Sequence, residues 1–430
     1  MNKIKQIFGG DARQLGMIFA LVALIILFQI LTGGLTLQPD NVNNIIQGNA
    51  YILVLAIGMV LVIIAGHIDL SVGSVAAFVG IVVAIAMRDW GIPWWAGILL
   101  GLVLGTVVGM WQGFWVAYVG IPAFIVTLSG FLFFRGANQF VGKSNTVPVP
   151  PEFQVIGAGT LPEVGPNTGY NNLTVLLGVL ACVGIIWGTL RGRRRLINIG
   201  ATVEDAWITY TRMALICIVV LGAMLLIASG RKGFPVPGLI LIALVLLYGF
   251  IASKMIIGRH IYAVGGNRHA AELSGVRSRR VNFLVMANMS LLAALAGMMF
   301  VARSNASGPF DGVGWELDAI AAVFIGGAAV SGGVGTVIGS IVGGLVMAVL
   351  NNGLQLLGAG ADATQMIKGL VLLVAVAFDI YNKSAGRPSI IGLLTGGRRG
   401  TKGSGGEAAE QPPTTGSEIS KIDETIGQSN

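Results

Sequence analysis

Residues 50–66 of this chain read AYILVLAIGMVLVIIAG, an apolar run without a charged residue. A helix needs about 20 mostly apolar residues to cross a hydrocarbon core of about 30 Å, so this run is close to the required length. A second apolar run, residues 70–87, follows after His67 and Asp69. The two runs predict a pair of membrane-crossing helices joined by a short break, of the kind tolerated where backbone lines a polar cavity.

The composition of the whole chain agrees with a membrane location. Hydrophobic residues make up 54% of the 430 residues and charged residues 11%, whereas soluble domains carry about 25% charged residues. We therefore predict an all-α, polytopic integral membrane protein with about 10–12 transmembrane helices, some of them discontinuous or re-entrant. The predicted spans are 16–32, 50–66, 70–87, 94–119, 122–141, 173–190, 213–229, 237–257, 282–302, 317–331, 335–357 and 365–382.

The chain divides into three predicted parts. Residues 1–32 form a cytoplasmic N-terminus and a first transmembrane helix, and residues 33–382 form the transmembrane domain, which includes a basic cytoplasmic loop at 258–280. Residues 383–430 contain hardly any large apolar side chains, so they cannot bury enough surface to fold. We expect them to be a disordered cytoplasmic tail.

The basic residues predict the orientation, because Lys and Arg in short loops are retained on the cytoplasmic side. Of the 27 Lys and Arg residues, 20 lie before Leu15, between Arg191 and Arg212, between Lys254 and Arg280, or beyond Asn382. Twelve crossings place all four segments on one side, with both termini cytoplasmic. The net charge of +8 is then explained by topology rather than by binding to nucleic acid.

Two series of glycines predict close helix packing. Glycines that recur every fourth residue leave a groove of bare backbone, which lets helices approach in lipid. Packing is the favoured role and pore lining the alternative. The glycines are Gly97, Gly101, Gly105, Gly109 and Gly113 in one series and Gly335, Gly339 and Gly343 in the other.

Polar residues inside apolar runs are candidates for a translocation path. Asp69 and Ser71 either cap the helix that begins near Val72 or line a polar route. A neutral solute rich in hydroxyl groups needs hydrogen-bond donors and acceptors without net charge, which amides and hydroxyls supply. The candidate path residues are Asp69, Ser71, Gln112, Asn138, Asn351 and Asn352.

The loop at 258–280 is predicted to carry a short helix outside the membrane. Asn267 is a good N-cap, and Gly275 is suited to end the helix. Such a helix is either surface structure or a contact for a separate motor subunit. The candidate coupling residues are Gly265, Gly266, Asn267, Ala270, Ala271, Glu272, Ser274 and Gly275.

Three stretches of the chain resemble the ribose/xylose branch of bacterial ABC-type sugar permeases over residues 40–382. They are GHIDLSVGS at 66–74, YAVGGN at 262–267 with Ala270, Ala271 and Gly275, and FIGG at 324–327 with GGVGT at 332–336. His269 stands where the family's coupling pattern has Glu. His67 and the extra spans around 173–229 are more similar to the xylose-type members.

The resemblance implies an ATP-driven importer of a monosaccharide, with xylose as the first candidate. It also implies a cytoplasmic ABC ATPase that docks on the 258–280 loop and a periplasmic sugar-binding protein. A second permease copy would make a homodimer in the lipid bilayer of a bacterial inner membrane. The substrate would pass through by alternating access.

Enzyme chemistry is not expected, and neither a cofactor nor a metal is predicted. Gly142-Lys143-Ser144 resembles the end of a phosphate-binding loop, but Ala137 stands where that motif needs glycine. The three histidines lack metal-ligand spacing, and Cys182 and Cys217 lie in apolar runs. The serious alternative is an ion-coupled secondary sugar transporter, which the scarcity of charges within the spans disfavours.

Overall fold

The computed structural model of the chain describes residues 12–383 except 202, 204 and 231. The described residues up to Ile380 belong to one compact unit. The basic N-terminal residues before Ala12 lie outside the described part. Apart from Lys383, so does the predicted tail.

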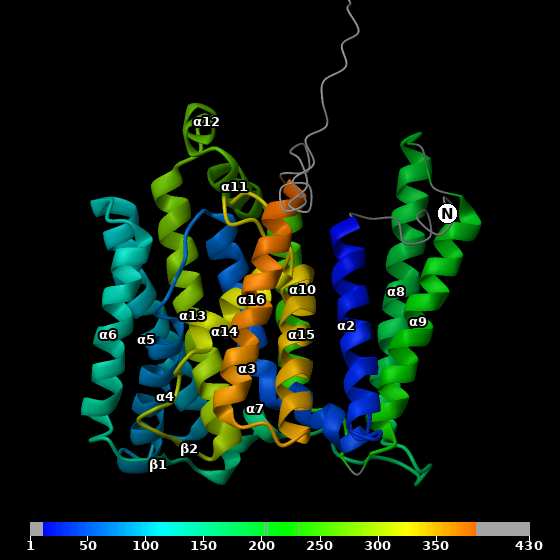
Figure 1. Cartoon of the computed structure of the whole chain (residues 1–430), viewed down its shortest axis with the longest axis horizontal. Helices are drawn as coiled ribbons and strands as arrows, with labels where there is room; N and C mark the ends of the chain where they lie inside the picture. The colour runs from blue at the N-terminus through cyan, green and yellow to red at the C-terminus, as the bar shows by residue number, and fades with distance from the viewer. Residues whose placement is uncertain (1–11, 202, 204, 231, 384–430) are drawn as a thin grey trace, which may run out of the picture. The chain divides into compact units, whose positions relative to one another are not determined.

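Helices dominate the described residues, which confirms the predicted all-α membrane fold (Figure 1). A short sheet pairs β1 (Val147–Pro148) with β2 (Ala306–Ser307) in antiparallel register, Val147 opposite Ser307. The helices are α2 (Ala12–Leu31), α3 (Pro39–Ile64), α4 (Val72–Asp89), α5 (Trp94–Phe114) with the π-turn η1 (Trp115–Val119), α6 (Ala123–Val141), η2 (Pro151–Gln154), α7 (Val155–Ala158), α8 (Asn172–Asn198), α9 (Ala206–Ala228), α10 (Val236–Lys254), α11 (Ile256–Gly266), α12 (Arg268–Leu273), α13 (Ser278–Ser304), α14 (Trp315–Ile325), α15 (Val337–Leu356) and α16 (Ala361–Lys383).

Nine helices among the described residues are long and apolar enough to cross a membrane, counting α5 and η1 as one. They are α3, α4, α5–η1, α6, α8, α9, α10, α13 and α15. The apolar part of α2, Gly16–Leu31, is shorter, and α16 adds a helix of 23 residues. With α14 these elements match the predicted spans one for one, although α14 is not a full crossing.

The span predicted at 317–331 is not one continuous helix but one of the discontinuous segments that the sequence analysis allowed for. Helix α14 has 11 residues and ends at Ile325, so it rises only about 16 Å. Residues 326–336 then form a loop in which Gly332 and Gly333 take positive φ values of 81° and 71°. These backbone angles favour glycine and interrupt the helix, so this segment is discontinuous.

The burial of the helices separates an inner group from an outer one. In the most apolar stretch of each helix, 72% of the residues are buried in α3, α4 and α13, and 67% in α15. In the corresponding stretches of α8 and α9 only 17% and 11% are buried, so these helices present most of their apolar surface to the outside. In lipid that arrangement is stable, because apolar side chains lose nothing by facing hydrocarbon.

Helices α8 and α9 form a hairpin that packs mainly on itself, with a smaller contact between α9 and α3. The chain leaves and re-enters the bundle at neighbouring points. Leu161 N donates to Phe234 O at 2.9 Å, and Val236 N donates to Gly159 O at 2.8 Å. The base of the hairpin is therefore closed by backbone hydrogen bonds.

The bundle has two distinct ends (Figure 1). Helices α11 and α12 lie at one end, which we call the α12 end, and strands β1 and β2 lie at the opposite end, which we call the β end. Helix α3 runs from the β end to the α12 end, and α13 runs back. Segments 142–172 and 303–316 thus meet through the β1–β2 ladder.

Candidate translocation path and coupling segment

The link between α3 and α4 carries a fully buried pair of polar side chains, Asp69 and Ser71. Asp69 Oδ1 accepts hydrogen bonds from Ser71 N at 2.8 Å and from Ser71 Oγ at 2.6 Å. Ser71 is the N-cap residue of α4, but no side chain caps that helix. Both side chains therefore belong to the interior of the bundle rather than to an ordinary helix cap.

Gln112 of α5 completes this cluster. Its Nε2 donates to Ser71 Oγ at 2.9 Å, and the Gln112 side chain is fully buried. Helix α6 closes the cluster from another side, because a Cβ built at Gly130 would overlap Gln112 Nε2. The sequence candidates Asp69, Ser71 and Gln112 thus come together although 41 residues separate Ser71 from Gln112.

The segment between α13 and α14 enters the bundle beside this cluster. Asn138 Nδ2 of α6 donates to Gly308 O at 3.3 Å and to Pro309 O at 3.1 Å. A Cβ at Gly73 would overlap the carbonyl oxygen of Gly312 and would lie 2.6 Å from Glu316 Oε2. Extended backbone within the bundle is therefore satisfied by side chains and sits against the first turn of α4, as expected for irregular backbone at membrane depth.

The polar interior has spare hydrogen-bonding capacity. Several buried atoms have no hydrogen-bond partner among the described residues: Asp69 Oδ2, Ser74 Oγ, Asn138 Oδ1, Ser307 Oγ and Glu316 Oε2. Buried polar atoms are normally paired, so each of these groups needs an explanation. A solute rich in hydroxyl groups could satisfy both donors and acceptors of this kind.

Asn351 and Asn352 lie elsewhere, near the last turn of α15. Asn352 and Asn41 of α3 exchange two amide hydrogen bonds of 2.9 Å, and Asn41 Nδ2 also donates to Thr36 O. The Oδ1 atom of Asn351 is buried without a partner among the described residues. The six sequence candidates therefore do not form one cluster: Asn352 joins two helix ends.

Sequence reasoning did not single out Glu316, which lies with Asp318 in the first turn of α14. Glu316 is 7% exposed, and its carboxylate lies against Gly73, in the first turn of α4 shortly after Asp69. Asp318 forms an ion pair of 3.0 Å with Lys368 of α16. The signal was available, since both acids interrupt an apolar stretch. Only the fold reveals that Asp318 pairs with Lys368 and that Glu316 interacts electrostatically with Arg135 of α6, while Glu316 Oε2 has no hydrogen-bond partner among the described residues.

Helices α11 and α12 form the candidate coupling segment. The Asn267 side chain caps α12 by accepting from Ala270 N at 3.0 Å. Gly275, with φ of 85°, ends the helix, and Gly275 N donates to Glu272 O at 2.9 Å. Ala271 is buried, whereas Leu273 is 78% exposed. The outer face of this short helix is thus free to meet another protein.

Glu272 fixes α12 to the beginning of α13. Its carboxylate accepts a hydrogen bond from Ser278 Oγ and an ion-paired one from Arg268 Nε at 3.0 Å. These contacts lower the pKa of Glu272 below its ordinary value, the Ser278 hydrogen bond contributing most. The helix is therefore held at both ends, by Asn267 and by Glu272.

The end of α11 touches two other links of the bundle through backbone alone. A Cβ at Gly265 would overlap the carbonyl oxygen of Ile64, and that oxygen accepts from Gly333 N at 2.8 Å. A Cβ at Gly333 would lie 2.8 Å from the Cα of Gly266. Tyr262 Oη also donates to Gly335 O at 2.6 Å. We call this contact of Ile64, Gly265, Gly266 and Gly333 the glycine junction.

The first glycine series lies along α5 and faces α13 and α4. A Cβ at Gly109 would lie 2.7 Å from the Cα of Ala287, and one at Gly113 would lie 3.0 Å from Phe283 O. A Cβ at Gly97 would lie 3.2 Å from the Met87 side chain. Likewise, Cβ atoms at Gly101 and Gly105 would overlap side chains of α13.

The second glycine series needs one correction. Gly339 and Gly343 of α15 pack against the backbone of α14 and its end, at Gly326 and Ala322. Gly335 is not on this helix face, because Thr336 N-caps α15 by accepting from Gly339 N at 2.9 Å and the helix starts at Val337. A spacing of four residues between glycines does not reveal where a helix begins.

Comparison with known proteins identifies the family. Residues 41–376 match the family described as branched-chain amino acid transport system / permease component. The chain is 39% identical to the xylose transport system permease protein XylH of Haemophilus influenzae over 85% of its own length and 96% of that protein. It is 40% identical to XylH of Escherichia coli K12, over 85% of this chain and 91% of the relative.

A ribose permease matches at a lower level. The identity to the ribose import permease protein RbsC of Escherichia coli K12 is 32%, over 84% of this chain and 92% of that protein. No solved structure matches the chain. The family match spans the helices from α3 to α16 and includes the three motifs that resemble sugar permeases. The chain belongs to the family of branched-chain amino acid transport system permease components.

Proposed function

We propose that this chain forms the translocation path of an ATP-driven importer for a monosaccharide, with xylose as the first candidate. Its relatives at 39% and 40% identity are named for xylose transport and the relative at 32% for ribose import. As a permease component it is a transport subunit rather than an enzyme, and it works with an ATPase and a substrate-binding protein. The ion-coupled alternative has no support among these relatives.

The observation that carries the mechanism is the glycine junction. It joins the end of α11, which leads directly into α12, to the last residue of α3 and to the loop between α14 and α15. The α3–α4 link and the α14–α15 loop flank the polar interior. Asp69 lies in the α3–α4 link, and Glu316 lies in α14, the helix that leads into the α14–α15 loop. A displacement of α12 therefore has a short, backbone-only route to the path.

Alternating access follows from this connection. The ATPase grips α12, and closure of the motor moves α11 as a rigid helix. Because packed interfaces are bistable rather than continuously deformable, the links at 65–71 and 326–336 shift together. The polar interior around Asp69, Ser71 and Gln112 then opens toward one end while the other stays closed.

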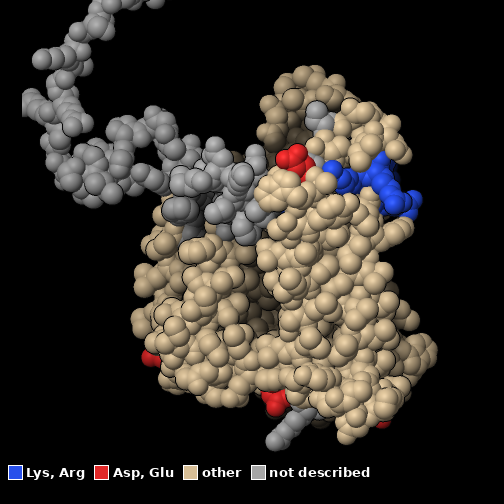
Figure 2. Space-filling model, turned by 90° about the vertical axis from the view of Figure 1, so that its right-hand side faces the viewer, with Lys and Arg blue, Asp and Glu red and all other residues tan. Residues whose placement is uncertain are grey.

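The charges support a cytoplasmic α12 end. Arg191 and Arg194 near the end of α8, Lys254 at the end of α10, and Arg279 at the start of α13 all lie toward this end. Figure 2 shows Lys and Arg gathered at one end of the face it draws, with an acidic group beside them, whereas only Asp and Glu are coloured toward the opposite end. By the positive-inside rule the termini and the ATPase lie on the α12 side.

The β end is the proposed docking side for the periplasmic binding protein. There the β1–β2 ladder and the backbone bonds at the base of the α8–α9 hairpin order the loop between α6 and α8. An ordered loop loses less conformational entropy when a partner binds it. A second copy of the chain completes the proposed assembly as a homodimer.

Uptake in proteoliposomes tests the proposal. The full chain is reconstituted with its ATPase and binding protein, and labelled xylose and ribose are compared with and without ATP. The proposal requires uptake that depends on ATP and on the binding protein, with xylose preferred. Uptake by this chain alone under a proton or sodium gradient would overturn it. ATP-dependent uptake of ribose but not xylose would retain the importer and change its substrate.

A further inference from the structure

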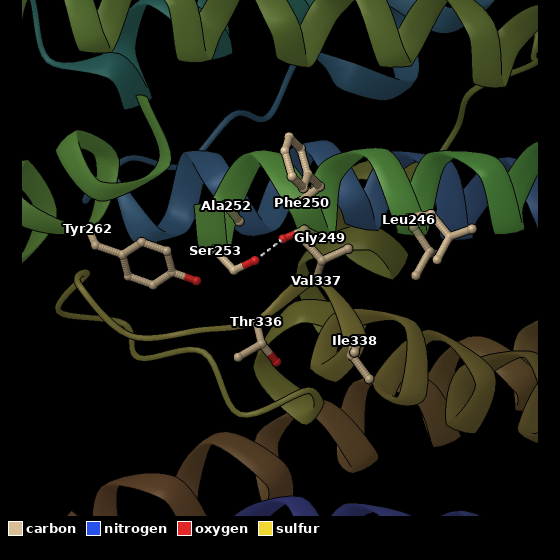
Figure 3. Close-up of a pocket in the computed structure, with 10 residues that line it drawn as sticks. Leu246, Gly249, Phe250, Ala252, Ser253, Tyr262, Thr336, Val337 and Ile338 are labelled. Atoms are coloured by element: carbon tan, nitrogen blue, oxygen red, sulfur yellow. Dashed lines mark hydrogen bonds between the residues drawn. The ribbon is translucent and has the colours of Figure 1, made fainter. Parts of the chain in front are cut away.

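A groove opens on the flank of the bundle between α10, α11 and the start of α15 (Figure 3). Its volume is about 440 Å³ and its walls are mostly apolar. Leu246 and Phe250 of α10 are 69% and 58% exposed and Ile338 of α15 is 68% exposed. The groove therefore faces outward, away from the polar interior, and its walls suit a hydrocarbon rather than a sugar.

The groove is polar at one end only. Figure 3 shows Tyr262, Ser253 and Thr336 toward one side and Leu246 and Ile338 toward the other. The hydroxyls of Tyr262 and Ser253 donate to Gly335 O and Gly249 O at 2.6 and 2.7 Å. Thr336 Oγ1 accepts from Gly339 N, so its own proton remains available for a ligand oxygen.

Helical spacing places two cations toward this polar end. Lys254 lies four residues after Phe250 on α10, so its side chain continues the stripe of the helix that lines the groove. Arg259 lies three residues before Tyr262 on α11 and shares its face in the same way. Both side chains are exposed, and neither has an ion-pair partner recorded within the described residues.

We propose that this groove binds an anionic phospholipid, with an acyl chain between α10 and α15 and its phosphate at Lys254 and Arg259. The eight helical steps from Leu246 to Lys254 span about 12 Å. This length carries the groove from the end of a membrane span, where headgroups lie, into the hydrocarbon region. Lys and Arg side chains at such a position extend toward the interface and attract anionic headgroups.

The charges favour a lipid over a second copy of this chain. In two copies related by a twofold axis along the membrane normal, each residue stays at the same height in the membrane. Two grooves that met would therefore meet polar end to polar end. Lys254 and Arg259 of one copy would then approach their counterparts in the other, and like charges oppose such an interface. A phosphodiester supplies the opposite charge, and its acyl chain fills the apolar end.

Native mass spectrometry of the purified full chain tests the proposal with two lipids of equal chain length, dioleoyl phosphatidylglycerol and dioleoyl phosphatidylcholine. The wild-type chain is expected to bind phosphatidylglycerol more tightly. Lys254→Gln combined with Arg259→Gln should lower that affinity about 30-fold and leave phosphatidylcholine binding unchanged. Arg194→Gln with Arg195→Gln, on α8, is the matched control and should change neither.

A second pair of variants tests the apolar end. Gly249→Phe fills the groove without a clash, because a Cβ there meets nothing within 4 Å, and it should abolish retention of both lipids. Gly222→Phe on α9, equally open, is the control and should have no effect. Ile338→Trp repeats the test at an exposed position, so that misfolding of one variant does not decide the result.

Three results would overturn the proposal. They are equal affinity of the wild-type chain for the two lipids, unchanged lipid binding in both Gly249→Phe and Ile338→Trp, and dissociation of a dimer by these variants without loss of lipid. The last result would assign the groove to a second copy of the chain. The proposal does not depend on the substrate or on the coupling role of α12.

Discussion

Gly265 packs its Cα directly against the carbonyl group of Ile64, leaving no space for a side chain at residue 265. The same carbonyl oxygen accepts a hydrogen bond from Gly333 N. One oxygen atom thus holds the end of α3, the end of α11 and the loop before α15 in register. A displacement of any one of these three segments therefore requires the other two to move as well.

Gly265→Ala should therefore uncouple transport from ATP hydrolysis. The methyl group forces α11 away from α3, and overpacking of this kind costs about 1–3 kcal/mol. Sugar uptake in proteoliposomes should fall at least tenfold while binding of the ATPase persists. Gly266→Ala is the matched control, since a Cβ at residue 266 meets nothing within 4 Å. Equal uptake by the two variants would contradict a coupling role for the junction.

Asn267→Ala should loosen α12 without unfolding the bundle. It removes the side-chain acceptor for Ala270 N, and loss of such an N-cap costs about 1 kcal/mol. Hydrogen exchange of the α12 amides should become faster and ATPase-dependent uptake should decrease. Asn267→Asp keeps an acceptor oxygen and should behave like the wild type. If exchange accelerates but uptake is unchanged, α12 is surface structure only.

Gln112→Met should impair uptake through the polar interior. Methionine matches the size of glutamine but cannot donate to Ser71 Oγ, and loss of a buried hydrogen bond costs about 1–3 kcal/mol. Thr106→Val on the same helix is the control, because Thr106 only bonds the backbone of its own helix at Leu102 O. Similar uptake by both variants would remove Gln112 from the path.

The ion pair between Asp318 and Lys368 should stabilise the packing of α16 against α14. Both side chains are largely buried, at 16% and 22% exposure, so removing one partner leaves a buried charge and costs about 3 kcal/mol. Lys368→Met should lower the thermal midpoint in detergent, and Lys368→Met combined with Asp318→Leu should recover most of it. A double variant no more stable than the single one would mean that the pair is not coupled.

The lowered pKa of Glu272 predicts how α12 responds to acid. A carboxylate whose folded-state pKa is depressed adds stability above its ordinary pKa of 4.5, and this stability is lost as the pH falls through the folded value. Hydrogen exchange of α12, corrected for the intrinsic pH dependence, should show reduced protection at acid pH. Glu272→Gln should remove this change, and a wild-type profile in the variant would exclude Glu272 as the cause.

Much of the helix layout followed from the sequence. The run predicted at 94–119 corresponds to α5 and η1, because this stretch is continuously apolar or small except for a few polar residues. The start of α3 was missed by 11 residues: its first turns, from Pro39 on, contain the amides of Asn41, Asn43 and Gln47, and apolar content cannot identify a helix that begins with polar residues.

Contacts between distant segments were less accessible. Asp69 and Gln112 were both candidates, but nothing in their spacing reveals that they share Ser71, since that depends on how α5 crosses α4. Asn352 looked equivalent to them and instead bonds Asn41. The half-length of α14 depends on where the backbone turns within a glycine-rich stretch, which apolar content does not indicate.

The α8–α9 hairpin has the geometry of an insertion. Its two ends lie beside each other, tied by the hydrogen bond between Leu161 and Phe234, and its helices share little surface with the inner group. Excising residues 172–230 would require only a short peptide to rejoin the chain, with α7 and α10 left in place. The transport core can thus gain or lose this hairpin during evolution without being rebuilt around it.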